Sequence, residues 1–227
     1  MNPVAALRLL GGPYVLLCAA QWVTTAGSAL TSFAMGVWIY ESSRQALDVA
    51  LLQVAATLPA LLVLPWAGSV ADRRPRRLVV LACDAVVGLA TALVALAAWS
   101  GQLAAWQLLL LCLVSSVARA FHWPAFRAFA STFLAPEQAA RGSGLMTFAD
   151  EAVTLLAPVC AGMLMAAAGI RLVLVVDVAL LVLGAGIVLR FAAPAGPVAA
   201  AQAPPASGGW LRAAWLDLRQ TVAFFGR

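Results

Sequence analysis

The sequence predicts an all-α membrane protein in which six hydrophobic transmembrane helices cross the bilayer. Of the 227 residues, 64% are hydrophobic and 10% are charged, whereas soluble domains average about 45–50% apolar and about 25% charged residues. The mean hydropathy of +0.97 agrees with this prediction. The apolar residues stand in continuous runs rather than in the alternating pattern of barrel strands. Because backbone groups in lipid must be bonded within their own segment, such runs form helices.

Six runs have the length of about 20 residues that a crossing helix needs. They fall at about 14–40, 46–70, 78–99, 103–125, 143–168 and 171–191. The first run is too long for the apolar part of a signal peptide and ends at no A-x-A cleavage site, so we expect it to remain as a helix. Residues 1–192 are therefore expected to form one bundle.

Aromatic residues mark the ends of the first four runs, as expected where helices meet the membrane surface. In chain order they are Tyr14, Trp38, Tyr40, Trp66, Trp99, Trp106 and Trp123. The fifth and sixth runs are separated only by a short break that ends at Arg171.

The arginines predict the orientation. With the N-terminus inside, the cytoplasmic segments hold 11 of the 14 positively charged residues, all of them Arg. The opposite side holds Arg44 and Arg171, and Arg119 lies within a helix. Because positively charged loops stay in the cytoplasm, we expect both termini there.

The last 35 residues differ from the bundle. Residues 193–209 are rich in Ala, Pro and Gly and predict a flexible cytoplasmic linker. In residues 210–227 the apolar side chains recur at helical spacing, with Arg212 and Arg219 elsewhere. This pattern predicts an amphipathic helix at the membrane surface.

Several classes of function are excluded by missing patterns. The four cysteines lie inside apolar runs without a C-x-x-C pair, and there is one His, so we expect no metal site and no cofactor. The chain has no phosphate-binding G-x-x-x-x-G-K-[ST] loop, no H-E-x-x-H and no G-x-S-x-G, which argues against an enzyme. The basic residues sit between apolar runs, so no nucleic-acid partner is expected.

Charged residues inside the predicted helices are functional candidates, because lipid makes them costly. At about 1.5 Å per residue, four of them lie roughly 9–12 Å from the cytoplasmic ends of their helices. These are Asp84, Arg119, Asp150 and Glu151. Our hypothesis is that Arg119 pairs with at least one of the carboxylates, in a cluster on the cytoplasmic side that breaks and reforms as the bundle changes access. The alternative is a static ion pair that fixes the helix register. For Asp177, nearer the outer face, we expect a helix-packing hydrogen bond.

The segment between the second and third runs reads Gly68-Ser-Val-Ala-Asp72-Arg73-Arg74-Pro-Arg76-Arg77. It fits the pattern G-x-x-x-D-[RK]-x-x-[RK]-[RK] and resembles the signature loop of the major facilitator superfamily. The alternative is a cytoplasmic positive loop of chance sequence. In that family the aspartate, here Asp72, locks two halves of the protein together in the outward-facing state.

Two further segments carry the resemblance. The stretch SSVARAFHWPAFRAFASTFLAPEQ, with Asp84, is similar to the subgroup of enterobactin-type siderophore exporters and macrolide efflux pumps. In the fifth run, three residues fall where antiporters of the family carry a glycine- and proline-rich motif: Gly144, Pro158 and Gly162. Three glycines of that motif are replaced, by Val153, Ala157 and Ala161, which counts against drug/proton antiport in particular.

The resemblance implies a fold in which these six helices form the N-terminal half, a 3+3 inverted repeat, of a two-half transporter. In the family the first and fourth helices line the substrate path. Polar residues at helical spacing on these two helices are therefore the cavity-lining candidates: Gln21, Thr25, Ser28, Ser32, Gln107, Ser115 and His122. The alternatives are polar residues that join helices and, for His122, a hydrogen-bonded surface residue.

The function that the resemblance implies is secondary transport in a bacterial plasma (inner) membrane. We expect efflux of a small organic compound of the drug or siderophore class, with a proton as the coupling ion. Beyond the lipid bilayer and the small-molecule substrate, the expected partner is a second six-helix half. We expect a truncated, split or fragmentary chain. The alternatives are a half-size protein that acts with a partner half or as a homodimer, and a truncated remnant that transports nothing.

Overall fold

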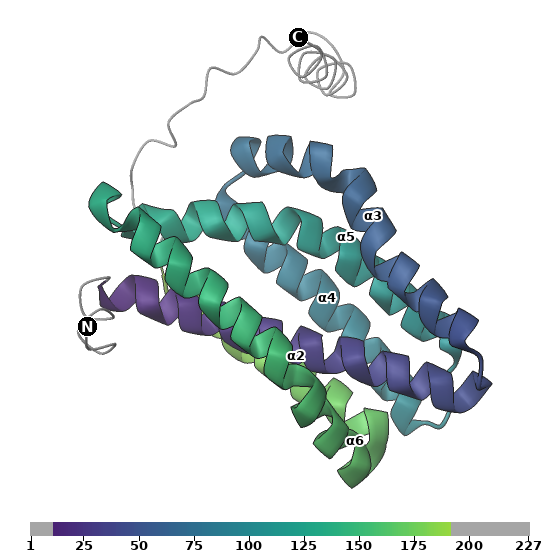
Figure 1. Ribbon diagram of the computed structural model, residues 1–227. Coiled ribbons are helices and arrows are strands. Elements are labelled where there is room, and N and C mark those ends of the chain that lie inside the picture. The colour runs from purple at the N-terminus through teal and green to yellow at the C-terminus, as the bar shows by residue number, and fades with distance from the viewer. Residues whose placement is uncertain (1–10, 192–227) are drawn as a thin grey trace, which may run out of the picture.

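The computed structural model describes residues 11–191, apart from the side chains of residue 65 and residues 68–73. The predicted linker 193–209 and amphipathic helix 210–227 lie outside these residues. The described part contains helices and no strand, and the long helices pack into one bundle (Figure 1). The elements are α2 (Gly12–Ser43), α3 (Ala46–Arg73), α4 (Arg76–Trp99), α5 (Ala105–Ala130), η1 (Ser131–Phe133), η2 (Pro136–Gln138) and α6 (Ala139–Arg190).

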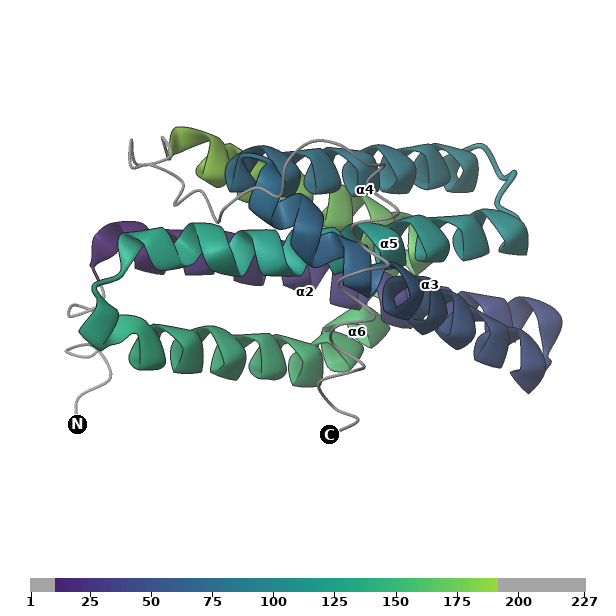
Figure 2. The same cartoon turned by 90° about the horizontal axis from the view of Figure 1, so that it is seen from above.

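The helix α6 is interrupted where the sequence separates the fifth and sixth runs. Ala168 leaves the helical region with φ −149°, and Gly169 has φ 67°. A positive φ suits glycine, which has no Cβ to collide with the backbone. The chain turns back at this point (Figure 2). The break therefore divides α6 into a first part, 139–167, and a second part, 170–190.

Four helical stretches are long and apolar enough to cross a membrane. They are Ala46–Leu64, Arg76–Trp99, Ala105–Phe133 and Pro136–Arg190, the last of which contains the break. The predicted run 14–40 lies within α2, which is helical throughout but is not among the four. The number of six crossing helices therefore stays a prediction.

The core consists of two apolar clusters at different levels of the bundle. One cluster includes Leu30, Leu108 and Leu174. The other includes Tyr14 and Phe126. The helices α2, α4 and α5 each contribute to one cluster near one end and to the other cluster near the opposite end, whereas α6 contributes to the first cluster around its break and to the second near both ends. The interior thus has two apolar layers, and a third layer that belongs to neither cluster lies between them.

The buried polar residues lie in or beside this middle layer, which we name the polar band. Its members are Gln21, Thr24, Thr31, Asp84, Thr91, Ser116 and Asp177. In lipid, a buried polar side chain is favourable only against other protein groups, where it can be hydrogen bonded. The fold therefore gathers its polar side chains between helices, halfway along the bundle.

Candidate functional site

The signature segment lies at the junction of α3 and α4. Gly68, Asp72 and Arg73 fall in the last turns of α3, and their side chains lie outside what the structure describes. The helix α3 extends to Arg73, so only Arg74 and Pro75 separate it from α4. Much of the predicted loop is therefore helical.

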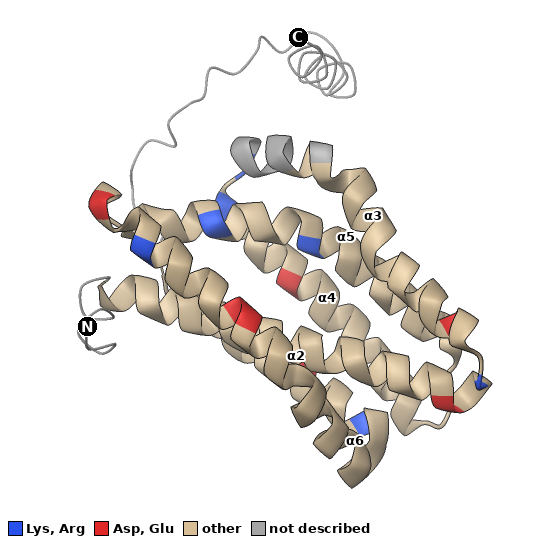
Figure 3. Cartoon of the chain, in the orientation of Figure 1, with Lys and Arg blue, Asp and Glu red and all other residues tan. Residues whose placement is uncertain are grey.

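Two arginines of this segment bind the ends of neighbouring helices. Arg76 Nη1 donates to the carbonyl oxygen of Ala128 in α5, at 3.0 Å. Arg77 Nη2 donates to the carbonyl oxygen of Leu189 in α6, at 2.6 Å. Both acceptors lie near helix C-termini, where carbonyls lack helical partners and the helix dipole favours a cation. Positive residues gather at this end of the bundle (Figure 3). The two arginines thus join the start of α4 to the ends of α5 and α6.

Asp84 of the polar band pairs with His122 and thereby joins α4 to α5. His122 Nε2 lies 3.1 Å from Asp84 Oδ1, and the two side chains are 12% and 9% exposed. The ring of His122 stacks on Phe126, with the ring centroids 5.9 Å apart. Gln21 and Thr24 of α2 and Gly184 of α6 line the same space, which is too small to hold a water molecule. The pair is therefore largely buried, with residues of four helices around it.

The residues of the predicted charge cluster do not all meet in this conformation. Asp84 is paired with His122, whereas Arg119, three residues earlier on α5, is exposed and forms no salt bridge with any described carboxylate. On α6, both carboxylate oxygens of Asp150 are buried without a hydrogen-bond partner among the described residues, and Glu151 is exposed. Pairing of Arg119 with a carboxylate stays a prediction for another state of the protein.

The polar stripe on α2 borders a buried face that sequence reasoning missed. Gln21 is buried and its Nε2 donates to Thr25 Oγ1 at 3.2 Å, while Ser28 is half-buried and Ser32 exposed. The adjacent face carries Thr24, Gly27 and Thr31 at spacings of three and four, and this face is buried. The recurrence of small residues on this face was the sequence signal that could have revealed it, because such residues allow helices to approach closely.

The candidates on α5 have different roles. Gln107 Oε1 accepts a hydrogen bond from the backbone N–H of Ala104 at 2.9 Å, so this side chain caps the start of α5. Ser115 is half-buried. Its neighbour Ser116 donates to the carbonyl oxygen of Ala56 at 2.7 Å and thereby joins α5 to α3.

The predicted helix-5 motif lies on an outward face of the first part of α6. Gly144 and Gly162 have no neighbouring atom within 4 Å of where a Cβ would stand, and Pro158 is exposed. The alanines that replace two motif glycines, Ala157 and Ala161, are buried. In the structure, the three motif residues therefore lie outside the core of the described residues.

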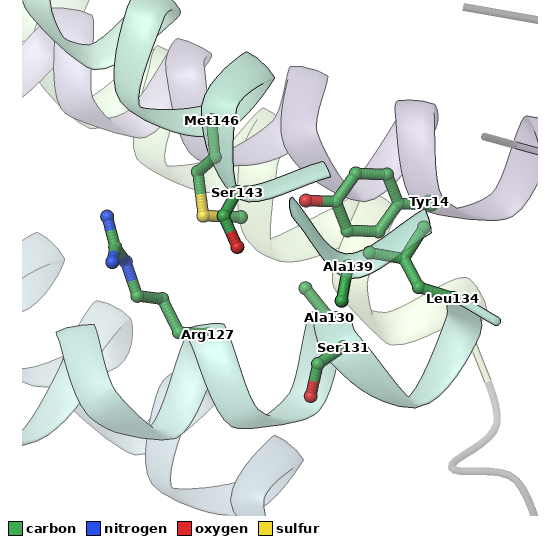
Figure 4. A pocket seen from close by; sticks show the side chains of 8 residues that line it. All are labelled: Tyr14, Arg127, Ala130, Ser131, Leu134, Ala139, Ser143 and Met146. Atoms are coloured by element: carbon green, nitrogen blue, oxygen red, sulfur yellow. The ribbon is translucent and has the colours of Figure 1, made fainter. Parts of the chain in front are cut away.

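A cavity of about 60 Å³ lies away from the ion pair, between the start of α2, the end of α5 and the start of α6 (Figure 4). Tyr14, Arg127, Ser131 and Ser143 supply its polar atoms. Sites for drug-sized molecules span about 300–1,000 Å³. This cavity can therefore hold a few waters or a small ion but not a drug-sized compound. The described residues contain no cluster of side chains suited to a metal ion.

Comparison with known proteins adds two findings. Residues 17–226 match the sequence model of the protein family described as Major Facilitator Superfamily. Macrolide efflux protein A of Streptococcus pyogenes is 21% identical over 165 residues, which cover 73% of this chain and 41% of the relative. The protein of the same name from a serotype M6 strain matches equally. The chain thus spans about two fifths of the length of the curated relatives that it matches.

Proposed function

The chain belongs to the major facilitator superfamily, and on this premise we propose that it forms the N-terminal six-helix half of a transporter that exports a small organic compound. The observation that carries the proposal is the polar band, a layer of buried polar and ionisable side chains halfway along apolar helices. Ionisable residues inside a membrane mark pathways for substrates or ions. The streptococcal relatives favour efflux of drug-like molecules.

The six-helix count is supported by α2 and by the break in α6. If α2 crosses the membrane, and if the two parts of α6 cross separately, the described helices make six crossings. Six crossings correspond to one half of the family's fold, whose substrate site lies between two halves.

The second half would contact the outward face of the first part of α6. Gly144 and Gly162 lie on this face beside exposed large side chains such as Phe148, and small residues are typical of helix contacts in membranes. A separately encoded half, a continuation of this chain or a second copy could supply that contact. The mass of the native protein, detected in its own membranes through its N-terminus, distinguishes a continuation from the other two.

The Asp84–His122 pair is the proposed site of proton coupling. A histidine and a carboxylate in contact can bind and release one proton as their surroundings change from dry to hydrated. In this conformation the pair is largely buried, with its two side chains 12% and 9% exposed. We propose that movement of the halves admits water, releases the proton and frees Asp84 for Arg119, which already lies one turn from His122.

The test is proton-driven transport of a radiolabelled macrolide by everted membrane vesicles that contain the native protein and any partner half. We expect Asp84→Asn and His122→Gln to abolish accumulation driven by a proton gradient while protein levels stay normal. Asp48→Asn, at a half-buried residue in the first turn of α3, is the matched control and should transport normally. Full transport by both pair variants would refute the coupling role, whereas no macrolide transport by the native protein would refute the proposed substrate class.

A further inference from the structure

Asp177 is a buried carboxyl group that the proposed transport step does not use. It lies in the second part of α6 and is 2% exposed. Thr31 Oγ1 of α2 donates to Asp177 Oδ2 at 2.8 Å, as expected for a helix-packing contact. The other oxygen, Oδ1, is buried and has no hydrogen-bond partner among the described residues.

The space for this carboxyl exists because residue 27 is glycine. A Cβ added at Gly27 would collide with Asp177 Oδ1 and would stand 3.2 Å from Asp177 Cα. The two helices therefore meet closely at this point, with Oδ1 held against the backbone of α2. Such a contact excludes water from one oxygen while the hydroxyl of Thr31 satisfies the other.

Among the described residues no charged group contacts Asp177, although Arg119 favours a negative charge there from a distance. Asp177 has no salt bridge with a described residue. On α2, the helix that covers it, the sole charged residue is Glu41, ten residues beyond Thr31. On α4, Asp84 is paired with His122. On α5, Arg119 interacts with Asp177 electrostatically without contact, and it is exposed.

We infer that Asp177 is a proton-binding site, and that its carboxyl group is protonated in this conformation. An ionised carboxylate buried without a paired charge is so unfavourable that the group neutralises by taking up a proton. A proton on Oδ2 turns the 2.8 Å contact into a hydrogen bond from Asp177 to Thr31, and a neutral Oδ1 tolerates its dry position. No other bond changes, and the proton exchanges with water when α2 and α6 separate. This inference goes beyond the proposed function, because it involves neither Asp84 nor His122.

The experiment is infrared spectroscopy of the purified native protein in lipid nanodiscs, with aspartate labelled by ¹³C at its side-chain carboxyl. At neutral pH, where an exposed aspartic acid is ionised, we expect a carboxylic-acid C=O band that shifts with the label. The band should be lost in Asp177→Asn and retained in Asp84→Asn, the control with a paired carboxylate. A spectrum in which Asp177→Asn leaves all carboxylic-acid bands unchanged would overturn the inference.

A second variant keeps the test decisive if Asp177→Asn does not fold. Thr31→Val removes the hydroxyl partner but keeps the shape of the side chain and the carboxyl group. We expect the C=O band to remain and to shift in frequency, because a hydrogen bond to the acid has been lost. Loss of the band in Thr31→Val would contradict the inference, because the carboxyl group would then be ionised in a buried position where the inference requires it to be neutral.

Discussion

The two parts of α6 differ sharply, although both are apolar helices of spanning length. The second part is buried at Val173, Leu174 and Asp177 and fits closely against α2. The first part exposes its largest side chains, with Leu155 77% and Phe148 73% exposed. Hydropathy alone does not distinguish the two. Close approach and buried polar groups mark contact between helices, whereas bulky exposed side chains mark a face for lipid or for a further helix.

Several glycines of α2 and α6 show where these helices meet closely and where they do not. Gly27 and Gly184 stand where a Cβ would collide with the opposite helix, whereas Gly144, Gly162 and Gly186 stand in open space. The contact between α2 and the second part of α6 thus depends on two residues without side chains. Variants can test whether this contact, rather than the outward face, holds the bundle together.

The largest effect is expected at the ion pair beside this contact. His122→Ala leaves the Asp84 carboxylate buried without a partner, which costs about 3 kcal/mol of unfolding free energy for a broken buried pair. Chemical denaturation in detergent micelles measures the loss. The double variant Asp84→Leu and His122→Leu removes both charges and should recover much of the stability. If the single variant is as stable as the native protein, the pair contributes nothing to the bundle.

A slightly smaller effect is expected from filling the contact. Gly184→Leu would place a Cβ against the side chain of Thr24 and 3.1 Å from the carbonyl oxygen of Ala20. Overpacking of this kind costs about 1–3 kcal/mol. Gly186→Leu, two residues away in open space, is the matched control and should be neutral or stabilising. Equal thermal midpoints for the two variants would show that α2 does not lie where the structure places it.

A matched pair of leucines compares the two parts of α6 directly. Leu174 is fully buried and Leu155 is 77% exposed. Leu174→Ala should cost about 2 kcal/mol, the lower end of the range for buried leucines, because lipid rather than water is the alternative surrounding. Leu155→Ala should leave the stability of this chain unchanged. The comparison fails if Leu155→Ala is the more damaging variant.

The smallest effect is expected at the arginines that follow α3. Arg76→Ala removes a part-buried hydrogen bond to the end of α5 and should cost about 1 kcal/mol. Arg77→Ala removes an exposed bond to the end of α6 and should cost less. Parallel denaturation curves measure both differences, and a larger loss for Arg77→Ala would reverse the order that burial predicts.

The sequence predicts the helices well and their faces poorly. Continuous apolar runs predict helices directly, and a positive φ at Gly169 agrees with the expected break before Arg171. The end of α3 was placed at residue 70, but the helix continues to Arg73. Charged residues are compatible with a helix end. The apolar run therefore ends before the helix, which continues through the charged residues that follow.

The candidate site shows the same limit: the sequence indicates its residues but not which of them pair. Asp84 and His122 were each named from the sequence, but Arg119 was expected as the partner of a carboxylate. The two cations are three residues apart on α5, and the rotation of that helix against α4 decides which one reaches Asp84. Rotation is set by the packing of side chains between the two helices, which a pattern of apolar residues does not encode.

The most direct test of the account is a disulfide between α2 and the second part of α6. A Cβ at Gly184 would stand 3.6 Å from Thr24 Cβ, within the range of about 3.5–4.5 Å for disulfides. In a background without the four native cysteines, we predict that Thr24→Cys and Gly184→Cys cross-link efficiently on oxidation in native membranes. The control pair, Thr24→Cys and Gly186→Cys, should remain reduced. Efficient cross-linking of the control pair but not of the test pair would contradict the account.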